Sequence, residues 1–268
     1  MALSVKRVED KRDIYRFLKQ DRLYAAYAVG DLEPALFRQC EWYAAFRDGR
    51  MTTLCLHFKG LRPHSIFIMG AAKDLPRILD RALKPAKRAF FASKADHLSA
   101  LAKFYSLQKV EEMFRMVLAP DDFIPVDGLV VRLGQGHLHQ LQELYRWGGD
   151  VAFASYQVEQ GVFYGVEKDH KLVATAGTHL VSRTYSLGIV GNVFTHPDYR
   201  RQGYATICTS AVVEELLSQS IDVVLNVEQD NEPAIKTYHR LGFHVYCPFV
   251  EALGTRKGTL WGRLSGQG

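Results

Sequence analysis

The chain has 268 residues, a length that predicts two compact domains. Hydrophobic residues make up 47% of it and charged residues 24%, a balance that excludes disordered, fibrous and coiled-coil proteins. The formal net charge is +5, and residues 1–125 hold 22 Lys and Arg against 15 Asp and Glu, whereas residues 126–268 hold 12 against 14. The mild basicity therefore belongs to the first half and predicts only weak attraction to anions.

Metal and membrane signals are missing from the sequence. The four cysteines, Cys40, Cys55, Cys208 and Cys247, form no C-x-x-C pair, and the ten histidines form no H-x-x-x-H arrangement. We therefore expect reduced thiols and no metal. The first residues become charged at Lys6 without an apolar signal segment, and no run approaches 18 apolar residues. We expect a cytoplasmic location and no membrane partner.

The two halves of the chain are similar at an offset of 121 residues. The matched segments are Trp42-Tyr43 with Phe163-Tyr164, Arg47–Met51 with Lys168–Leu172, and Ser65–Gly70 with Ser186–Gly191. Each half predicts an antiparallel three-stranded meander, preceded by a short strand (5–8 or 129–131) and a helix. The alternative is that two unrelated α+β domains share this order. Because prolines and acids interrupt the pattern at 119–125, we predict domains at 1–122 and 126–268.

A glycine-bearing loop follows the third strand of the second half only. Arg200-x-x-Gly203-x-Ala205 lies between a strand that ends at Phe194-Thr195 and a predicted helix with apolar residues at helical spacing. A helix N-terminus presents free N–H groups that bind a pyrophosphate, and Gly203 lets the backbone approach the oxygens closely. Taken alone, the same pattern also fits an ordinary basic turn. The first half has Ala71–Pro76 at this place, so we expect the two halves to diverge there.

A strand and a short helix come next in the second half. The strand is predicted at 223–227, and the helix starts after Asn231, a natural cap, and stops at Gly242. Ala234, Tyr238 and Leu241 share one face of this helix by their spacing.

These segments together resemble the GCN5-related N-acetyltransferase (GNAT) superfamily. Val193-x-Thr195-x-Pro197-x-x-Arg200-x-x-Gly203-x-Ala205 looks like the acyl-CoA signature of that family, and 225–243 looks like its second motif. The resemblance implies an α/β (α+β) fold with two GNAT-like domains, each a mixed, largely antiparallel sheet flanked by helices. The chain looks like a tandem GNAT protein with a degenerate N-terminal copy, because the first half lacks the loop.

The resemblance also implies an acyl-CoA-dependent N-acyltransferase that uses acetyl-CoA and a small-molecule or peptide amine. In the family, backbone groups before the loop hold the pantetheine arm, and loop N–H groups hold the pyrophosphate. The implied cofactor-binding residues are Val193, Phe194, Thr195, Arg200, Arg201, Gln202, Gly203, Tyr204, Ala205, Thr206, Asn226 and Asn231. Tyr238 corresponds to the tyrosine that protonates the leaving thiolate; otherwise it is a core aromatic.

Several alternatives stay open. Glu159, Glu228, His179 and His196 are candidates for the general base by position, and each also fits a solvated or structural role. The basic run at 81–88 is either a solvated helix end or an electropositive wall for an acidic acceptor. A non-catalytic acyl-CoA-binding or regulatory module is the alternative function. We expect no nucleic-acid partner, because no helix-turn-helix, zinc or RNP-type signature is present. Nothing in the sequence specifies the acceptor or the oligomeric state.

Overall fold

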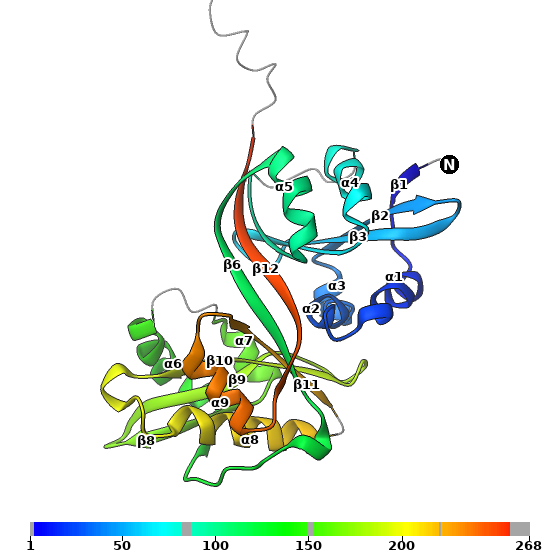
Figure 1. Cartoon of the computed structure of the whole chain (residues 1–268). Coiled ribbons are helices and arrows are strands. Elements are labelled where there is room, and N and C mark those ends of the chain that lie inside the picture. The colour runs from blue at the N-terminus through cyan, green and yellow to red at the C-terminus, as the bar shows by residue number, and fades with distance from the viewer. Residues whose placement is uncertain (1–2, 82–86, 149–152, 220, 258–268) are drawn as a thin grey trace, which may run out of the picture. The chain divides into compact units, whose positions relative to one another are not determined.

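The computed structural model describes residues 3–81, 87–148, 153–219 and 221–257 (Figure 1). The chain forms two compact units, unit 1 with Met1–Met113 and Pro248–Gly268, and unit 2 with Phe114–Cys247. Most of the basic run at 81–88 lies outside the described residues.

Unit 1 is a mixed sheet with helices on both faces (Figure 1). Its elements are β1 (Leu3–Arg7), α1 (Lys11–Leu18), α2 (Ala26–Gly30), α3 (Pro34–Phe37), β2 (Cys40–Arg47), β3 (Arg50–Phe58), β4 (His64–Gly70), α4 (Leu75–Arg81), β5 (Arg88–Ser93), α5 (Leu98–Phe104) and the start of β6 (Tyr105–Leu118). The strand order is β1-β2-β3-β4-β5-β12, where β12 spans His244–Arg256. β4 and β5 are parallel, whereas the pairs β1/β2, β2/β3, β3/β4 and β5/β12 are antiparallel.

Unit 2 repeats this plan. Its elements are β7 (Val131–Arg132), α6 (Leu138–Tyr145), α7 (Ser155–Gln160), β8 (Phe163–Lys168), β9 (Lys171–Ser182), β10 (Leu187–Thr195), α8 (Tyr204–Ser218), β11 (Asp222–Glu228) and α9 (Glu232–Arg240). The strand order is β6-β11-β10-β9-β8-β7, with β10 and β11 parallel. One hydrophobic cluster joins the sheet to α8 and α9 (Val212, Leu216, Tyr238), and another contains Leu141 and Leu144 of α6 and Val158 of α7.

The equivalent hairpin turns share an unusual backbone conformation. Asp48 and Gly49 between β2 and β3 have φ values of 47° and 77°, and Asp169 and His170, 121 residues further on, have 49° and 61°.

The mixed, largely antiparallel fold with flanking helices is confirmed for both units. The expected divergence after the third strand concerns the glycine loop alone, since α4, β5 and α5 follow in the same order as α8, β11 and α9. Only the connection differs: α4 begins after a short 3₁₀ turn instead of a glycine loop.

The compact units do not coincide with the predicted domains 1–122 and 126–268. The chain passes from one unit to the other within β6, between Met113 and Phe114. The part of β12 from Pro248 onwards belongs with unit 1, because β12 pairs with β5 from Val250 opposite Ser93 to Thr255 opposite Arg88. Such pairing between distant segments leaves no local signal in a sequence.

The structure also describes the cysteines, the possible metal ligands and the helices that could cross a membrane. All four cysteines are free; three are buried, and Cys247 is half-buried. In the described part of the chain, no three His, Cys, Asp or Glu side chains are grouped so as to hold a metal ion. Among the helices of that part, none has the length and apolarity to cross a bilayer. The strand predicted at 129–131 is reduced to the two residues of β7, and Leu129 is 90% exposed.

Candidate active site

The two parallel strands of unit 2, β10 and β11, are paired over only part of their length. Their pairing ends at Val190 opposite Leu225, although β10 continues to Thr195 and β11 to Glu228. β10 stays paired with β9 as far as Thr195. Among the described residues, the final part of β10 therefore has a partner strand on the β9 side and no paired residue on the β11 side.

A bulge in β10 marks the place of this divergence. Gly191 pairs with Gly177 and Phe194 with Thr175, so β10 has one residue more than β9 between these pairs. Asn192 adopts a φ of 53°, a conformation that asparagine tolerates better than most side chains. The bulge lies directly beyond Val190, the last residue of β10 that pairs with β11.

Helices α6 and α7 hold the bulge in place. The hydroxyl of Tyr145 donates a hydrogen bond of 2.8 Å to the carbonyl oxygen of Asn192, and burial raises the pKa of this phenol. The amide nitrogen of Asn192 donates to the side-chain oxygen of Gln157 at 3.3 Å and to the carbonyl of Thr178 at 3.4 Å. Sequence reasoning missed Tyr145, Gln157 and Asn192; the one available signal was a Gly-Asn pair inside a predicted strand, which is typical of a bulge.

The loop between β10 and α8 is exposed and contains two residues in the left-handed region. Arg201 has a φ of 64° and Gly203 a φ of 80°, and Arg201, Gln202 and Gly203 are exposed. The Nε of Arg200 donates to the carbonyl of Thr195 at 3.3 Å, which ties the loop to the end of β10. A Cβ atom on Gly203 would have no atom within 4 Å, so the surrounding space is open.

The N-terminus of α8 has no side-chain cap among the described residues. Gly203 is the N-cap residue, and the first intrahelical bond runs from the Ile207 N–H to the Gly203 carbonyl at 3.1 Å. The N–H groups of Tyr204, Ala205 and Thr206 precede this bond, so they are available to a ligand. With 15 residues, α8 is long enough for its dipole to favour an anion at this end.

Tyr238 is a buried residue of α9. It is 8% exposed, packs against Phe243 with ring centroids 6.0 Å apart, and belongs to the same hydrophobic cluster as Leu225 and Val227 of β11. Burial raises its pKa to about 12. The phenol is therefore fully protonated at neutral pH and can act as a proton donor.

The two predicted asparagines both precede Tyr238 in the chain and have different surroundings. Asn226 is the first residue of β11 beyond the last pair with β10. Because Leu225 and Val227 face the α8 cluster, Asn226 faces the other side of the sheet. Asn231 caps α9 as expected, and its side-chain oxygen accepts from the N–H of Ala234 at 3.2 Å.

The four candidates for the general base lie in different surroundings in unit 2. Glu159 and Glu228 are exposed at positions on α7 and β11. The Nδ1 atom of His196 accepts from the Asp198 N–H at 3.3 Å, and its ring packs against Trp147 with centroids 4.6 Å apart. His179 lies on β9 of unit 2 and is half-buried.

In unit 1, the position equivalent to the glycine loop is filled by a carboxylate. Asp74 precedes α4 and is completely buried. Its oxygens accept from the Nε of Arg47 at 3.0 and 3.1 Å and from the hydroxyl of Thr52 at 2.6 Å. The start of α4 thus has an ion-paired carboxylate where unit 2 has the glycine loop.

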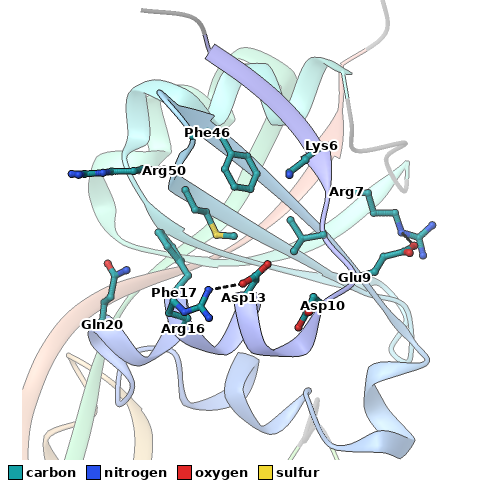
Figure 2. A pocket seen from close by; sticks show the side chains of 13 residues that line it. Lys6, Arg7, Glu9, Asp10, Asp13, Arg16, Phe17, Gln20, Phe46 and Arg50 are labelled. Atoms are coloured by element: carbon teal, nitrogen blue, oxygen red, sulfur yellow. Dashed lines mark hydrogen bonds and ion pairs between the residues drawn. The ribbon is translucent and has the colours of Figure 1, made fainter.

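A cavity of about 590 Å³ also lies in unit 1, between β1, α1 and the β2–β3 turn (Figure 2). Two ion pairs line it: Arg7 pairs with Glu9 at 3.1 Å and Arg16 with Asp13 at 2.6 Å. Asp10 caps α1 by accepting from the Arg12 N–H. The cavity belongs to unit 1, and its lining residues point to no particular ligand.

Comparison with known proteins supports the geometry of unit 2. Residues 134–243 match the family model described as Acetyltransferase (GNAT) family. The chain matches no curated protein. It is similar in fold to a GCN5-related N-acetyltransferase from Kribbella flavida (TM-score 0.62, 14% identity, 90% of this chain and 97% of the other covered). It is also similar to a tandem GNAT protein from the clavulanic acid biosynthesis pathway (0.57, 14%, 96% and 100%) and to a Drosophila protein (0.71, 13%, 94% and 98%).

The similarity to the tandem GNAT protein covers both units, which agrees with a tandem arrangement whose first copy lacks the glycine loop. The family model covers the bulge, the loop, α8, β11 and α9. Residues 134–243, which include the loop of unit 2, are thus similar to the acetyltransferase (GNAT) family.

Proposed function

We propose that the chain is an N-acetyltransferase that moves the acetyl group of acetyl-CoA to a primary amine of a small molecule or peptide. The observation that carries this proposal is the uncapped N-terminus of α8, reached through Arg201 and Gly203 in left-handed conformations. The family match over residues 134–243 supports the same assignment.

The residues present fit acetyl-CoA in three respects. The N–H groups from Arg201 to Thr206 would bind the pyrophosphate, and the side chains of Arg200 and Arg201 add positive charge. The backbone of Val193–Thr195 would pair with the pantetheine arm as a strand would. In addition, Asn192 Oδ1 and Thr195 Oγ1 are buried without a hydrogen-bond partner among the described residues, and a ligand between β10 and β11 would supply one.

The chemistry needs a proton donor for the sulfur that leaves. Tyr238 would give its phenolic proton to the departing thiolate, because its pKa of about 12 keeps it protonated until the sulfur becomes negative. Asn226 faces the side of the sheet from which the acceptor amine would approach. The side chain of Asn231 already caps α9, so its contribution to the site is to fix the start of the helix that carries Tyr238.

The experiment has two steps. Calorimetry with acetyl-CoA measures binding, and thiol release in the presence of a broad panel of amines measures turnover. Binding together with amine-dependent thiol release supports the proposal. Binding without release for any amine supports a non-catalytic acyl-CoA-binding module, and no binding contradicts both.

A further inference from the structure

Asn192 carries the first side chain that β10 presents beyond its last pair with β11. Pairing between these strands ends at Val190, and the next residue, Gly191, has no side chain. A Cβ atom at position 191 would collide with the ring of His179, which covers the backbone there. The amide of Asn192 is therefore the polar side chain of β10 that follows most closely after the two strands diverge.

Hydrogen bonds on one side of Asn192 fix which end of its amide is the nitrogen. The N–H of Ala154 donates to Oε1 of Gln157 at 2.9 Å, and Nε2 of Gln157 donates to the carbonyl of His179 at 3.3 Å. The amide of Gln157 therefore has one orientation only. Its Oε1 atom and the carbonyl oxygen of Thr178 both face the amide of Asn192, and both are acceptors. The nitrogen of Asn192 points to them, and Oδ1 is the other end of the group.

Oδ1 of Asn192 is buried and accepts no hydrogen bond from any residue that the structure describes. Asn192 is 6% exposed, its carbonyl oxygen accepts from Tyr145, and its amide nitrogen has the two partners given above. A buried amide oxygen without a donor costs free energy, so native structures rarely keep one. A donor supplied by a ligand removes this cost when the site is occupied.

The side chain of Asn192 leaves the sheet on the face opposite to Tyr238. Its amide contacts Gln157 of α7. Val190 and Val193, on either side of Asn192 in β10, pack instead in the cluster that contains α8 and Tyr238. A thioester held between the ends of β10 and β11 would thus have the phenol on one face and the amide oxygen on the other.

Of the two substrates of the proposed reaction, the acceptor amine fits this oxygen better than acetyl-CoA does. The pantetheine arm would pair with the backbone of Val193–Thr195 as a strand does, and the N–H groups of a paired strand lie in the plane of the sheet. Side chains project out of that plane. An amine that approaches the thioester from the α7 face brings its N–H groups to the side on which the amide of Asn192 lies.

We propose that Asn192 holds the acceptor amine by accepting a hydrogen bond from one of its N–H groups at Oδ1, an inference that rests on the acetyltransferase activity proposed above. The hydrogen bond uses an N–H and leaves the lone pair of the neutral amine nitrogen for attack on the thioester carbon. An amide oxygen accepts hydrogen bonds and is not a titrating group, so Asn192 orients the amine and is not the base.

Two unreactive analogues of acetyl-CoA test this contact without knowledge of the acceptor. In S-(N-methylcarboxamidomethyl)-CoA, an amide N–H stands beyond the sulfur where the acceptor nitrogen would arrive. In S-(methoxycarbonylmethyl)-CoA, an ester oxygen replaces that N–H with almost no change in size. Calorimetry measures the affinity of the full chain for both analogues and for acetyl-CoA. The wild-type chain should bind the amide on the order of 10-fold more tightly than the ester, because only the amide offers a donor to the buried oxygen.

Asn192→Gly removes Oδ1 and suits the backbone, because glycine readily adopts the φ of 53° found there. This variant should bind the two analogues equally and keep the wild-type affinity for acetyl-CoA. Gln140→Leu is the matched control, since Oε1 of Gln140 on α6 is also buried without a partner in the described part of the chain. The control should keep the preference for the amide.

A wild-type chain without a preference between the analogues overturns the proposal, and this result depends on no variant. A preference that persists in Asn192→Gly, or that the control also loses, overturns it as well. So does a loss of acetyl-CoA affinity in Asn192→Gly, which would assign the oxygen to the cofactor. In each of these cases the proposed function stands if the wild-type chain binds acetyl-CoA. If acetyl-CoA does not bind, the proposed function fails and this inference fails with it.

Discussion

Gly203 is the residue whose replacement tests the phosphate loop most cleanly. Its φ of 80° lies in the region that disfavours a side chain, yet a Cβ atom there would meet no atom within 4 Å. Gly203→Ala therefore adds backbone strain and no collision. A left-handed conformation costs a residue with a Cβ about 1–2 kcal/mol.

The strain in Gly203→Ala lowers either the free energy of unfolding or the affinity for acetyl-CoA. Because the neighbouring loop residues Arg201 and Gln202 are exposed, the loop of the free variant can relax, and the cost then falls on binding. A cost of about 1–2 kcal/mol corresponds to a loss of about 5- to 30-fold in acetyl-CoA affinity. If the loop does not relax, the free energy of unfolding falls by the same amount and the affinity is retained.

The assay pairs calorimetry with denaturant unfolding. Gly136→Ala is the matched control, because a Cβ atom at Gly136 also meets nothing within 4 Å, and its φ is not in the left-handed region. The control should keep both affinity and stability. If Gly203→Ala likewise keeps both, the reasoning about this loop is refuted.

Three further predictions concern other parts of the two units. Tyr238→Phe should lower kcat on the order of 10²-fold with unchanged acetyl-CoA affinity in calorimetry, because only the phenolic proton is removed; an unchanged kcat would exclude the proton-donor role. Tyr145→Phe removes the buried hydrogen bond to the Asn192 carbonyl and should reduce the free energy of unfolding by about 1 kcal/mol in urea titrations, whereas no loss would show that the bulge does not depend on it. The hydrogen bonds from Arg47 hold the pKa of Asp74 below its ordinary value of 3.8, so this ion pair contributes stability above that value and loses it as the pH falls through the lowered pKa. The urea midpoint of the wild-type chain should thus fall more steeply below about pH 4 than that of Asp74→Asn; parallel curves would contradict the assignment.

The loop and the elements around it could be predicted because their signals are local. Gly203 needs its left-handed conformation whatever lies elsewhere in the chain, and Asn231 caps α9 through a contact three residues away. The repeat was also readable, since the hairpin turns at Asp48 and Asp169 depend on short segments. Roles of the predicted cofactor residues and of Tyr238 stay predictions.

The rest depends on contacts between distant segments. The return of β12 to unit 1, the bulge at Asn192 and the burial of Asp74 by Arg47 all join residues that are far apart in sequence. The position of His179 could not be predicted for the same reason. In the sequence it is one of ten histidines, and its place over Gly191 arises only from the register of β9 against β10.

The central claim is that the N-terminus of α8 binds the pyrophosphate of acetyl-CoA, and amide NMR of the ¹⁵N-labelled chain tests it most directly. On titration with acetyl-CoA, the N–H signals of Arg201–Thr206 should show the largest shifts. The N–H signals at the start of α4, where the carboxylate of Asp74 is buried, should not move. Shifts that leave 201–206 unchanged would contradict the account.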